Sequence, residues 1–181
     1  MSTIKLQNVR LAFADLFNPD EKYGRFGASF PIQPGSANAK AIEAAIDEVA
    51  KAKWGAKSAG VLATIRSKGD IAYQTTPKTN SSGDVYAGFE QMYCLNTSSK
   101  TRPTVVDRDR SPLTETDGRP YSGCYVVAIV ELWAQDNSWG KRVNATLKGV
   151  QFFADGEAFS GGTPASAGDF EDLGAFDEAM A

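Results

Sequence analysis

Two stretches near the start of the chain alternate apolar and polar residues, which is the period of a half-buried β-strand. The first covers residues 3–13 and slips by one position at Gln7 and Asn8, which predicts a strand interrupted by a β-bulge. The second covers residues 22–32, after turn-forming residues around Pro19. We expect these segments to open the fold as two antiparallel strands.

One stretch between these strands and the middle of the chain has helical periodicity. Ser36 or Asn38 can cap a helix that runs to about Trp54, and Gly55 ends it. Its apolar residues recur at helical spacing: Ile42, Ala45, Ile46 and Val49. A single helix among many strands is expected to pack across a sheet or the end of a barrel.

The remaining apolar segments indicate further strands. Residues 61–66 and 69–74 are short β-like stretches, residues 77–84 form a polar loop, and residues 85–97 indicate a longer strand. Residues 121–135 are the longest β-like run. Alternate positions in it share one face that is wholly apolar: Cys124, Val126, Ala128, Val130 and Leu132. The return strand alternates likewise, with Val143, Ala145 and Leu147 inward and Arg142, Asn144, Thr146 and Lys148 outward.

This order of elements predicts a mainly β fold. It fits an OB-fold-like antiparallel β-barrel, closed or partly open, with one packed helix. We assign residues 1–153 to this domain. Residues 154–168 are rich in small residues and predict a flexible linker, and residues 169–181 predict an acidic C-terminal tail that is disordered on its own.

Charge is divided unevenly along the chain. Residues 1–148 hold all 19 basic residues and 15 of the 22 acidic ones, which gives this part a formal charge of +4. Residues 149–181 hold the other seven acidic residues and no basic one. A basic body with an acidic tail is typical of nucleic-acid-binding proteins, although a solvated tail on an ordinary domain gives the same division.

Several residue types and motifs are absent from the sequence, and their absence excludes some classes of enzyme and of metal site. The chain has no histidine, which excludes histidine-dependent catalysis, and its two cysteines give no metal-ligand set. The sequence has no Ser-x-x-Lys, dinucleotide-binding or P-loop motif, so we expect neither an enzyme nor a cofactor. Cys94 and Cys124 lie in apolar runs and predict reduced core thiols. Without a secretory signal or an 18-residue apolar run, the expected location is the cytoplasm.

A basic loop over residues 100–119 leads directly into the longest predicted strand. Because the strand fixes where the loop's charges lie, this arrangement predicts a polyanion site. Single-stranded nucleic acid requires cations for its phosphates and aromatic faces for its bases. The predicted phosphate contacts are Arg25, Lys100, Arg102, Arg108, Arg110, Arg119, Lys141, Arg142 and Lys148, and the predicted stacking residues are Tyr23, Tyr121 and Trp139.

Each of these assignments has a structural alternative. The arginines interleaved with Asp107 and Asp109 can form salt bridges instead, and the same two carboxylates are the weak basis for a third class, a hydrolase. Tyr23 and Tyr121 can pack at a barrel rim. Packing is the favoured interpretation of three further aromatic residues: Trp54, Tyr125 and Trp133.

The acidic tail has two predicted uses. It can occupy the basic groove in the absence of DNA, and once displaced it can dock on other proteins. The predicted partner-binding residues of the tail are Asp169, Phe170, Glu171, Asp172, Phe176, Asp177 and Glu178. The alternative is that the tail only aids solubility.

Several motifs together resemble one protein family. They are LAFADLF near the start, KAKWG at the helix end, RPTVVDRD, DGRPYSGCYV, the turn at Asp136 and Asn137, and GVQFFADGEAFSGG. In this order they resemble the OB-fold single-stranded DNA-binding proteins of tailed bacteriophages, a family formerly of unknown function. The resemblance covers nearly the whole chain.

The resemblance implies a protein that coats single-stranded DNA (ssDNA), with little sequence preference, during phage DNA replication, recombination and repair in the host cell cytoplasm. It also implies that the tail recruits phage or host replication proteins. Removal of the tail is expected to tighten binding and extend it to duplex DNA, and self-association on DNA stays open. The alternative from the residues is a β-rich structural or assembly protein of the virion. No membrane partner or metal is expected.

Overall fold

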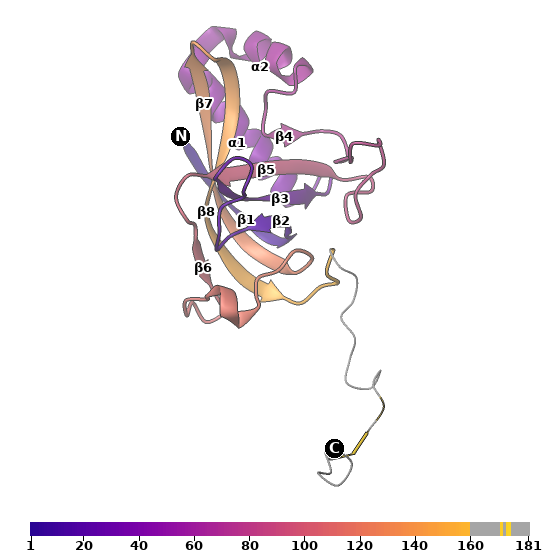
Figure 1. The fold of residues 1–181 in the computed structure, drawn as a ribbon. Coiled ribbons are helices and arrows are strands. Elements are labelled where there is room, and N and C mark those ends of the chain that lie inside the picture. Colours follow the sequence, from indigo (N-terminus) through magenta and orange to yellow (C-terminus); the bar gives the residue numbers. More distant parts are fainter. Residues whose placement is uncertain (160–170, 172, 175–181) are drawn as a thin grey trace.

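A bent first strand organises the fold, because its two halves pair at opposite ends of one sheet (Figure 1). The computed structural model describes residues 1–159, 171, 173 and 174. β1 (Ser2–Arg10) pairs antiparallel with β7 (Tyr125–Asn137), and β2 (Ala12–Asp15) pairs antiparallel with β3 (Phe26–Ile32). The register of β1 shifts between Leu6 and Val9, so the predicted bulge is confirmed.

The described residues form an eight-stranded sheet whose main path is β1-β7-β8-β5-β3-β2. Its other strands are β8 (Gly140–Ala154), β5 (Tyr93–Ser99), β4 (Tyr73–Gln74) beside β5, and β6 (Thr104–Val106) beside β8. β8 runs parallel to β5 and β6, so the sheet is mixed. Because both ends of the path belong to one bent strand, the sheet curls into a partly open barrel. The predicted mainly β, OB-fold-like architecture is confirmed.

Two helices pack on this barrel, α1 (Ala37–Trp54) and α2 (Ser58–Ser67), where the sequence predicted one. The Ser36 side chain caps α1 by accepting a hydrogen bond from Ala39 N at 3.2 Å, and the chain leaves the helix at Gly55, as predicted. Short 3₁₀ turns follow at Gly55–Lys57 and later at Glu115–Asp117.

The predicted strand at residues 61–66 is wrong, because this segment lies in α2. Its two buried apolar residues, Leu62 and Ile65, are three positions apart and face the core beside α1 from one side of a helix. A short apolar run fits both periods, and packing against α1 decides in favour of the helix.

The predicted strand over residues 85–97 is correct only in its last part, because β5 begins at Tyr93. Gly88 (φ 86°) and Gln91 (φ 59°) turn the preceding chain back on itself. This turn buries Phe89 in a small second core with Ala12 and Cys94. The aromatic residues of the segment therefore serve this second core rather than a strand face.

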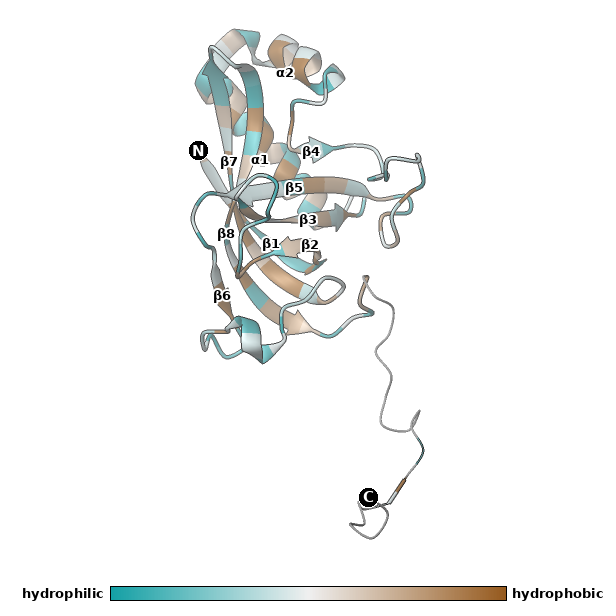
Figure 2. Cartoon of the chain, in the orientation of Figure 1, coloured by the Kyte–Doolittle hydropathy of each residue, from teal (hydrophilic) through white to brown (hydrophobic). Residues whose placement is uncertain are grey.

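The long hairpin of β7 and β8 follows its predicted parity. The five apolar residues of β7 and its approach are fully buried, and Val143, Ala145 and Leu147 of β8 face the same core. The hairpin extends beyond the barrel towards α2, and Figure 2 shows that this distal part is largely hydrophilic. Trp54 at the end of α1 supports it by donating a hydrogen bond from Nε1 to Asp136 Oδ2 at 2.9 Å.

Residues 155–159 lie against the barrel, although the sequence predicted a flexible linker from residue 154, which belongs to β8. Arg10 donates to Glu157 O at 2.6 Å and places its guanidinium 4.0 Å from the centre of the Phe159 ring. Phe159 N donates to Ser122 O at 3.1 Å. We call residues 155–159 the strap. The rest of the predicted linker and tail, except for residues 171, 173 and 174, lies outside the described residues.

The two cysteines are buried and free, as predicted. Burial raises the pKa of each thiol to about 11. At pH 8 the thiolate fraction of such a group is about one in a thousand, so we expect no reaction with Ellman's reagent in the native state. Both thiols should react once the protein is unfolded in urea. Rapid labelling of either cysteine in the native protein would contradict this placement.

Candidate nucleic-acid interface

A groove of about 660 Å³ crosses the outer face of β5, β7 and β8. Among the residues that line it are three cations, Arg25, Lys100 and Arg142, and no carboxylate. We call it the central groove. Its remaining lining residues are Ala72, Asn96, Ser98, Ser99, Trp133, Gln135, Asn144, Ala145 and Thr146. The strands therefore bring together three predicted phosphate contacts that are up to 117 residues apart in sequence.

The floor of the central groove is polar and cross-linked between β7 and β8. Trp133 donates from Nε1 to Thr146 Oγ1 at 3.0 Å, and Asn144 donates from Nδ2 to Gln135 Oε1 at 2.9 Å. These bonds hold the half-buried indole of Trp133 in the groove. The sequence interpretation of Trp133 as a packing residue overlooked this position, although its parity on the mixed face of β7 was the signal.

Arg25 reaches the groove from a loop that Asp20 holds in shape. Both Tyr23 N and Arg25 N donate to the Asp20 carboxylate at 2.9 Å, and these hydrogen bonds lower the pKa of Asp20. On the opposite wall, Arg142 Nη2 lies 3.0 Å from Asp70 Oδ1. Arg25 and Arg142 are thus placed by neighbouring groups before any ligand binds.

The central groove continues at one end into a cavity of about 310 Å³, with which it shares Arg25 and Ser98. Phe13, Asp15 and Tyr23 line this cavity, which we call the aromatic end. The Tyr23 side chain is 71% exposed, so the structure leaves the ring of this predicted stacking residue accessible.

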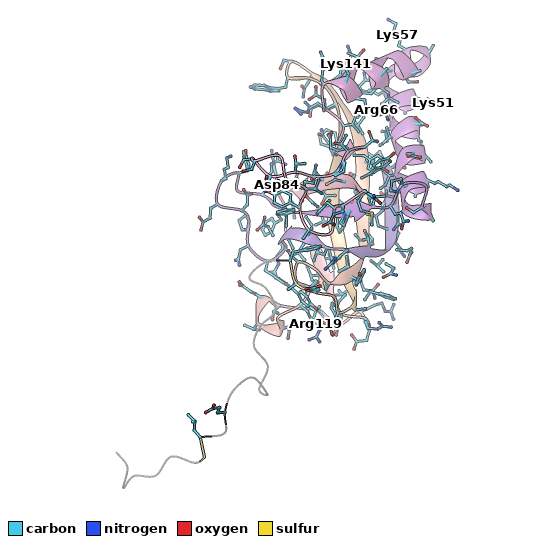
Figure 3. All side chains as sticks on the ribbon, turned by 90° about the vertical axis from the view of Figure 1, so that its right-hand side faces the viewer. Lys51, Lys57, Arg66, Asp84, Arg119 and Lys141 are labelled. Atoms are coloured by element: carbon cyan, nitrogen blue, oxygen red, sulfur yellow. The ribbon has the colours of Figure 1, made fainter. Side chains whose placement is uncertain are left out.

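At its other end the groove adjoins a cavity of about 820 Å³ between α2 and the tip of the β7–β8 hairpin. Trp139 at the tip is 87% exposed, and Lys141 lines the cavity together with Lys57 and Lys68. Asp70 also lines it and bonds Arg142 of the central groove. Figure 3 shows Lys57 and Lys141 at this end of the molecule.

Four other predicted phosphate contacts lie outside the central groove. Lys148 and Arg110 share a cavity of about 330 Å³ with Lys5, further along the outer face of β7 and β8. The Arg102 guanidinium lies 5.3 Å from the centre of a phenylalanine ring at position 17. Arg108 donates a hydrogen bond to the backbone oxygen of residue 153. These four residues therefore do not line the central groove.

Arg119 and Tyr121 are engaged within the protein. Arg119 Nη2 lies 2.6 Å from Asp107 Oδ2, and this hydrogen bond lowers the pKa of Asp107 and raises that of Arg119. The Tyr121 hydroxyl donates to Asp155 Oδ1 at 2.8 Å, and burial raises its pKa. Arg119 lies at the opposite end of the molecule from Lys141 (Figure 3). The basic loop of residues 100–119 therefore does not form one wall.

Comparison with known proteins identifies the family to which this sequence belongs. The family model described as "Enterobacter phage Enc34, ssDNA-binding protein" matches residues 2–180. The chain belongs to this family. The resemblance that its motifs indicated is thereby confirmed.

Individual relatives agree with this assignment to the Enc34 family. A putative protein p50 of Acyrthosiphon pisum secondary endosymbiont phage 1 is 43% identical over 180 residues, which cover 97% of this chain and 96% of that protein. The ssDNA-binding protein of bacteriophage Enc34 in complex with ssDNA is 23% identical, with a TM-score of 0.68 over 87% of this chain and 89% of that one.

Two further solved structures share the fold. A C-terminal truncation of the Enc34 protein is 24% identical, with a TM-score of 0.69 over 87% of this chain and 88% of that one. The ssDNA-binding protein gp2.5 of bacteriophage T7 is 12% identical, with a TM-score of 0.56 over 97% and 98% of the two chains. At these identities the likeness shows the fold alone.

This Enc34-family chain also has a cation beside the groove that the sequence analysis did not single out. Lys78 donates from Nζ to Asn96 Oδ1 at 3.2 Å and lies 5.4 Å from the centre of the Phe13 ring. It comes from the polar loop of residues 77–84, which has no periodicity to show where its side chains point. Phe13 could not be assigned to the aromatic end without the pairing of β2 with β3, which brings it beside Ser29 and Thr97.

In the part of the chain that the structure describes, no group of three or more Cys, Asp or Glu residues could hold a metal ion. None of the described helices is long and apolar enough to cross a membrane.

Proposed function

We propose that this Enc34-family protein binds ssDNA along the central groove with little sequence preference. The observation that carries the proposal is that Arg25, Lys100 and Arg142 line one groove together with Trp133. Cations that follow the phosphates, with aromatic faces for the bases, bind single strands without base readout, and each stacked base contributes roughly 1–3 kcal/mol.

The proposed path runs from Tyr23 at the aromatic end, over Trp133, to Trp139 at the hairpin tip. Lys148 lies seven residues from Lys141 on β8, or about 23 Å at the usual rise of a strand, and it is therefore placed outside this path. We rank the residues of the central groove and its two ends first. Predicted contacts outside this path are assigned a flanking role: Arg102, Arg108, Arg110, Arg119, Tyr121 and Lys148.

Tryptophan fluorescence with oligo-dT at increasing salt tests this function. We expect quenching on binding, because Trp133 and Trp139 lie on the path, and affinity that falls steeply with salt as counterions are released. An absence of binding at low salt would overturn the proposal. A virion structural protein, the alternative from the sequence, need not show this salt dependence.

In the cell we propose that the protein coats ssDNA during phage DNA replication, recombination and repair in the host cytoplasm, without catalysing a reaction. Membership of a family of phage ssDNA-binding proteins supports this role. The acidic tail is proposed to recruit phage or host replication proteins, with Glu171 and the other predicted tail residues as contacts. Pull-down of replication proteins by the full chain, but not by a chain without residues 169–181, would support recruitment.

Deletion of residues 169–181 is expected to tighten ssDNA binding several-fold at low salt and to extend it to duplex DNA. The deleted segment carries five carboxylates and no cation, so it competes with phosphates for the groove. The truncation should end after residue 168, which keeps the strap against Arg10. Titration of both chains with labelled oligonucleotides measures the change, and equal affinities would contradict competition.

A further inference from the structure

Phe13 has a backbone conformation that a bulky residue rarely adopts. Its φ is 49°, in the left-handed region, and yet 44% of its side chain is exposed. Such a conformation costs about 1–3 kcal/mol and is enriched at functional sites. Here it accompanies the register shift between Ala12 and Asp15 in the pairing of β2 with β3. An exposed ring does not repay this cost by burial, so the position of the ring itself needs an explanation.

The surrounding residues hold the Phe13 ring in place at the aromatic end. Tyr86 meets it edge-on, with ring centres 4.9 Å apart and planes at 74°, and the Phe89 ring centre lies 6.2 Å away. Lys78 Nζ lies 5.4 Å from the ring centre. Phe13 also lines a neighbouring cavity of about 530 Å³. Lys78 lies over one face of this fixed, partly exposed ring, so the ring can offer its other face to a planar ligand.

Asp15 lies beside this platform, because it lines the same two cavities as Phe13. None of the hydrogen bonds found among the described residues uses its carboxylate, whereas the nearby Asp20 carboxylate accepts hydrogen bonds from Tyr23 N and Arg25 N. An anionic group repels phosphates. The ligand group that approaches Asp15 must therefore be a hydrogen-bond donor, and in DNA such donors lie on the bases.

We propose that Phe13 and Asp15 form a base-reading subsite, in which a nucleobase stacks on Phe13 and donates its exocyclic amino group to the Asp15 carboxylate. This proposal rests on the proposed ssDNA binding and adds a base preference to it. The neighbouring phosphates lie towards Arg25 and Lys78, on either side of the aromatic end.

The chemistry of the bases determines which of them this subsite should prefer. Cytosine presents its N4 amino group and adenine its N6 amino group, and a carboxylate accepts a hydrogen bond from either. Thymine has no amino group, and its single ring donor, N3–H, lies between two carbonyl oxygens that the carboxylate would repel. The subsite is therefore expected to favour oligo-dC over oligo-dT, while the cations of the central groove bind both alike.

The test compares the affinities of the full chain for oligo-dC and oligo-dT of equal length at pH 8. The wild type should prefer oligo-dC by roughly three- to tenfold, which is the usual net contribution of one hydrogen bond. Asp15→Ala should bring this ratio close to one. Removal of a negative charge alone strengthens binding of both oligonucleotides equally, so only the ratio reports base reading.

Phe13→Ala should weaken binding of both oligonucleotides roughly tenfold by removing one stacked base. The matched controls are Asp47→Ala on the exposed side of α1 and Phe153→Ala at an exposed ring outside the groove, with thermal unfolding to verify folding. An unchanged ratio in Asp15→Ala, or unchanged affinities in Phe13→Ala, would overturn the subsite while leaving ssDNA binding intact. Failure of the wild type to bind either oligonucleotide would overturn both proposals.

Discussion

Simultaneous replacement of Arg25, Lys100 and Arg142 by Ala is expected to lower ssDNA affinity at least a hundredfold near physiological salt. Each side chain lines the central groove, and a lost phosphate contact weakens binding by roughly tenfold. The slope of log affinity against log salt should also become shallower by about 2, because three fewer counterions are released on a single strand. Fluorescence titrations with oligo-dT at several salt concentrations measure both effects.

The matched control removes three cations from outside the groove. Lys40, Lys51 and Lys53 are exposed on α1, so their replacement by Ala changes the net charge equally. Affinity should fall only slightly, through the weaker long-range field of the protein. If the two triple variants lost affinity to the same extent, net charge rather than the central groove would account for binding.

Replacement of Gly123 by Ala is expected to release the strap and to produce a large loss of stability. Gly123 has φ 115°, and an added Cβ would overlap Glu157 O and lie 2.7 Å from Ala158 Cα. Because both obstacles are backbone, residues 155–159 must move away and lose their contacts with Arg10 and Ser122. Urea unfolding followed by circular dichroism measures the free energy of unfolding, and limited proteolysis detects a released strap.

Gly140→Ala is the control for this variant. Gly140 has nearly the same φ, 113°, but an added Cβ there would meet no atom within 4 Å. Both variants carry the backbone strain, and only Gly123→Ala carries the steric overlap. We expect Gly123→Ala to be less stable than the control by about 2 kcal/mol, or about 4–8 °C in Tm. Equal stability of the two variants would mean that the strap is not tightly packed.

Periodicity predicted those parts of the fold in which one face of an element is buried. The hairpin of β7 and β8 was predicted with its correct inward faces because a strand between core and solvent alternates strictly. The bulge at Asn8 and the end of α1 at Gly55 could also be predicted from the sequence. The first is marked by a slip in the alternation and the second by the glycine itself. Segments whose structure depends on packing against a distant part of the chain could not be predicted from local sequence. The helix α2 is an example.

The sequence predicted the types of residue that form the candidate site better than it predicted which individual residues line it. Charge and parity singled out Arg25, Lys100 and Arg142, which share one groove. The same reasoning also selected Arg119 and Tyr121, which bond Asp107 and Asp155 and line no part of this groove. Arg142 bonds Asp70 as well, but it does so at the groove. Nothing local distinguishes an arginine beside a groove from one paired with a carboxylate, because the pairing of distant strands decides which charges meet.

The bent first strand has a further consequence for a protein that is proposed to coat a nucleic acid. Exposed edge strands invite pairing between neighbouring molecules and lead to aggregation, above all at high local concentration. Here one bent strand, β1 and β2, occupies both ends of the sheet path, and Asn38 of α1 bonds the backbone N and O of Gln7 on β1 at 3.0 and 2.8 Å. For molecules that coat DNA as proposed, this arrangement leaves fewer backbone groups at the ends of the sheet path open to pairing with a neighbour.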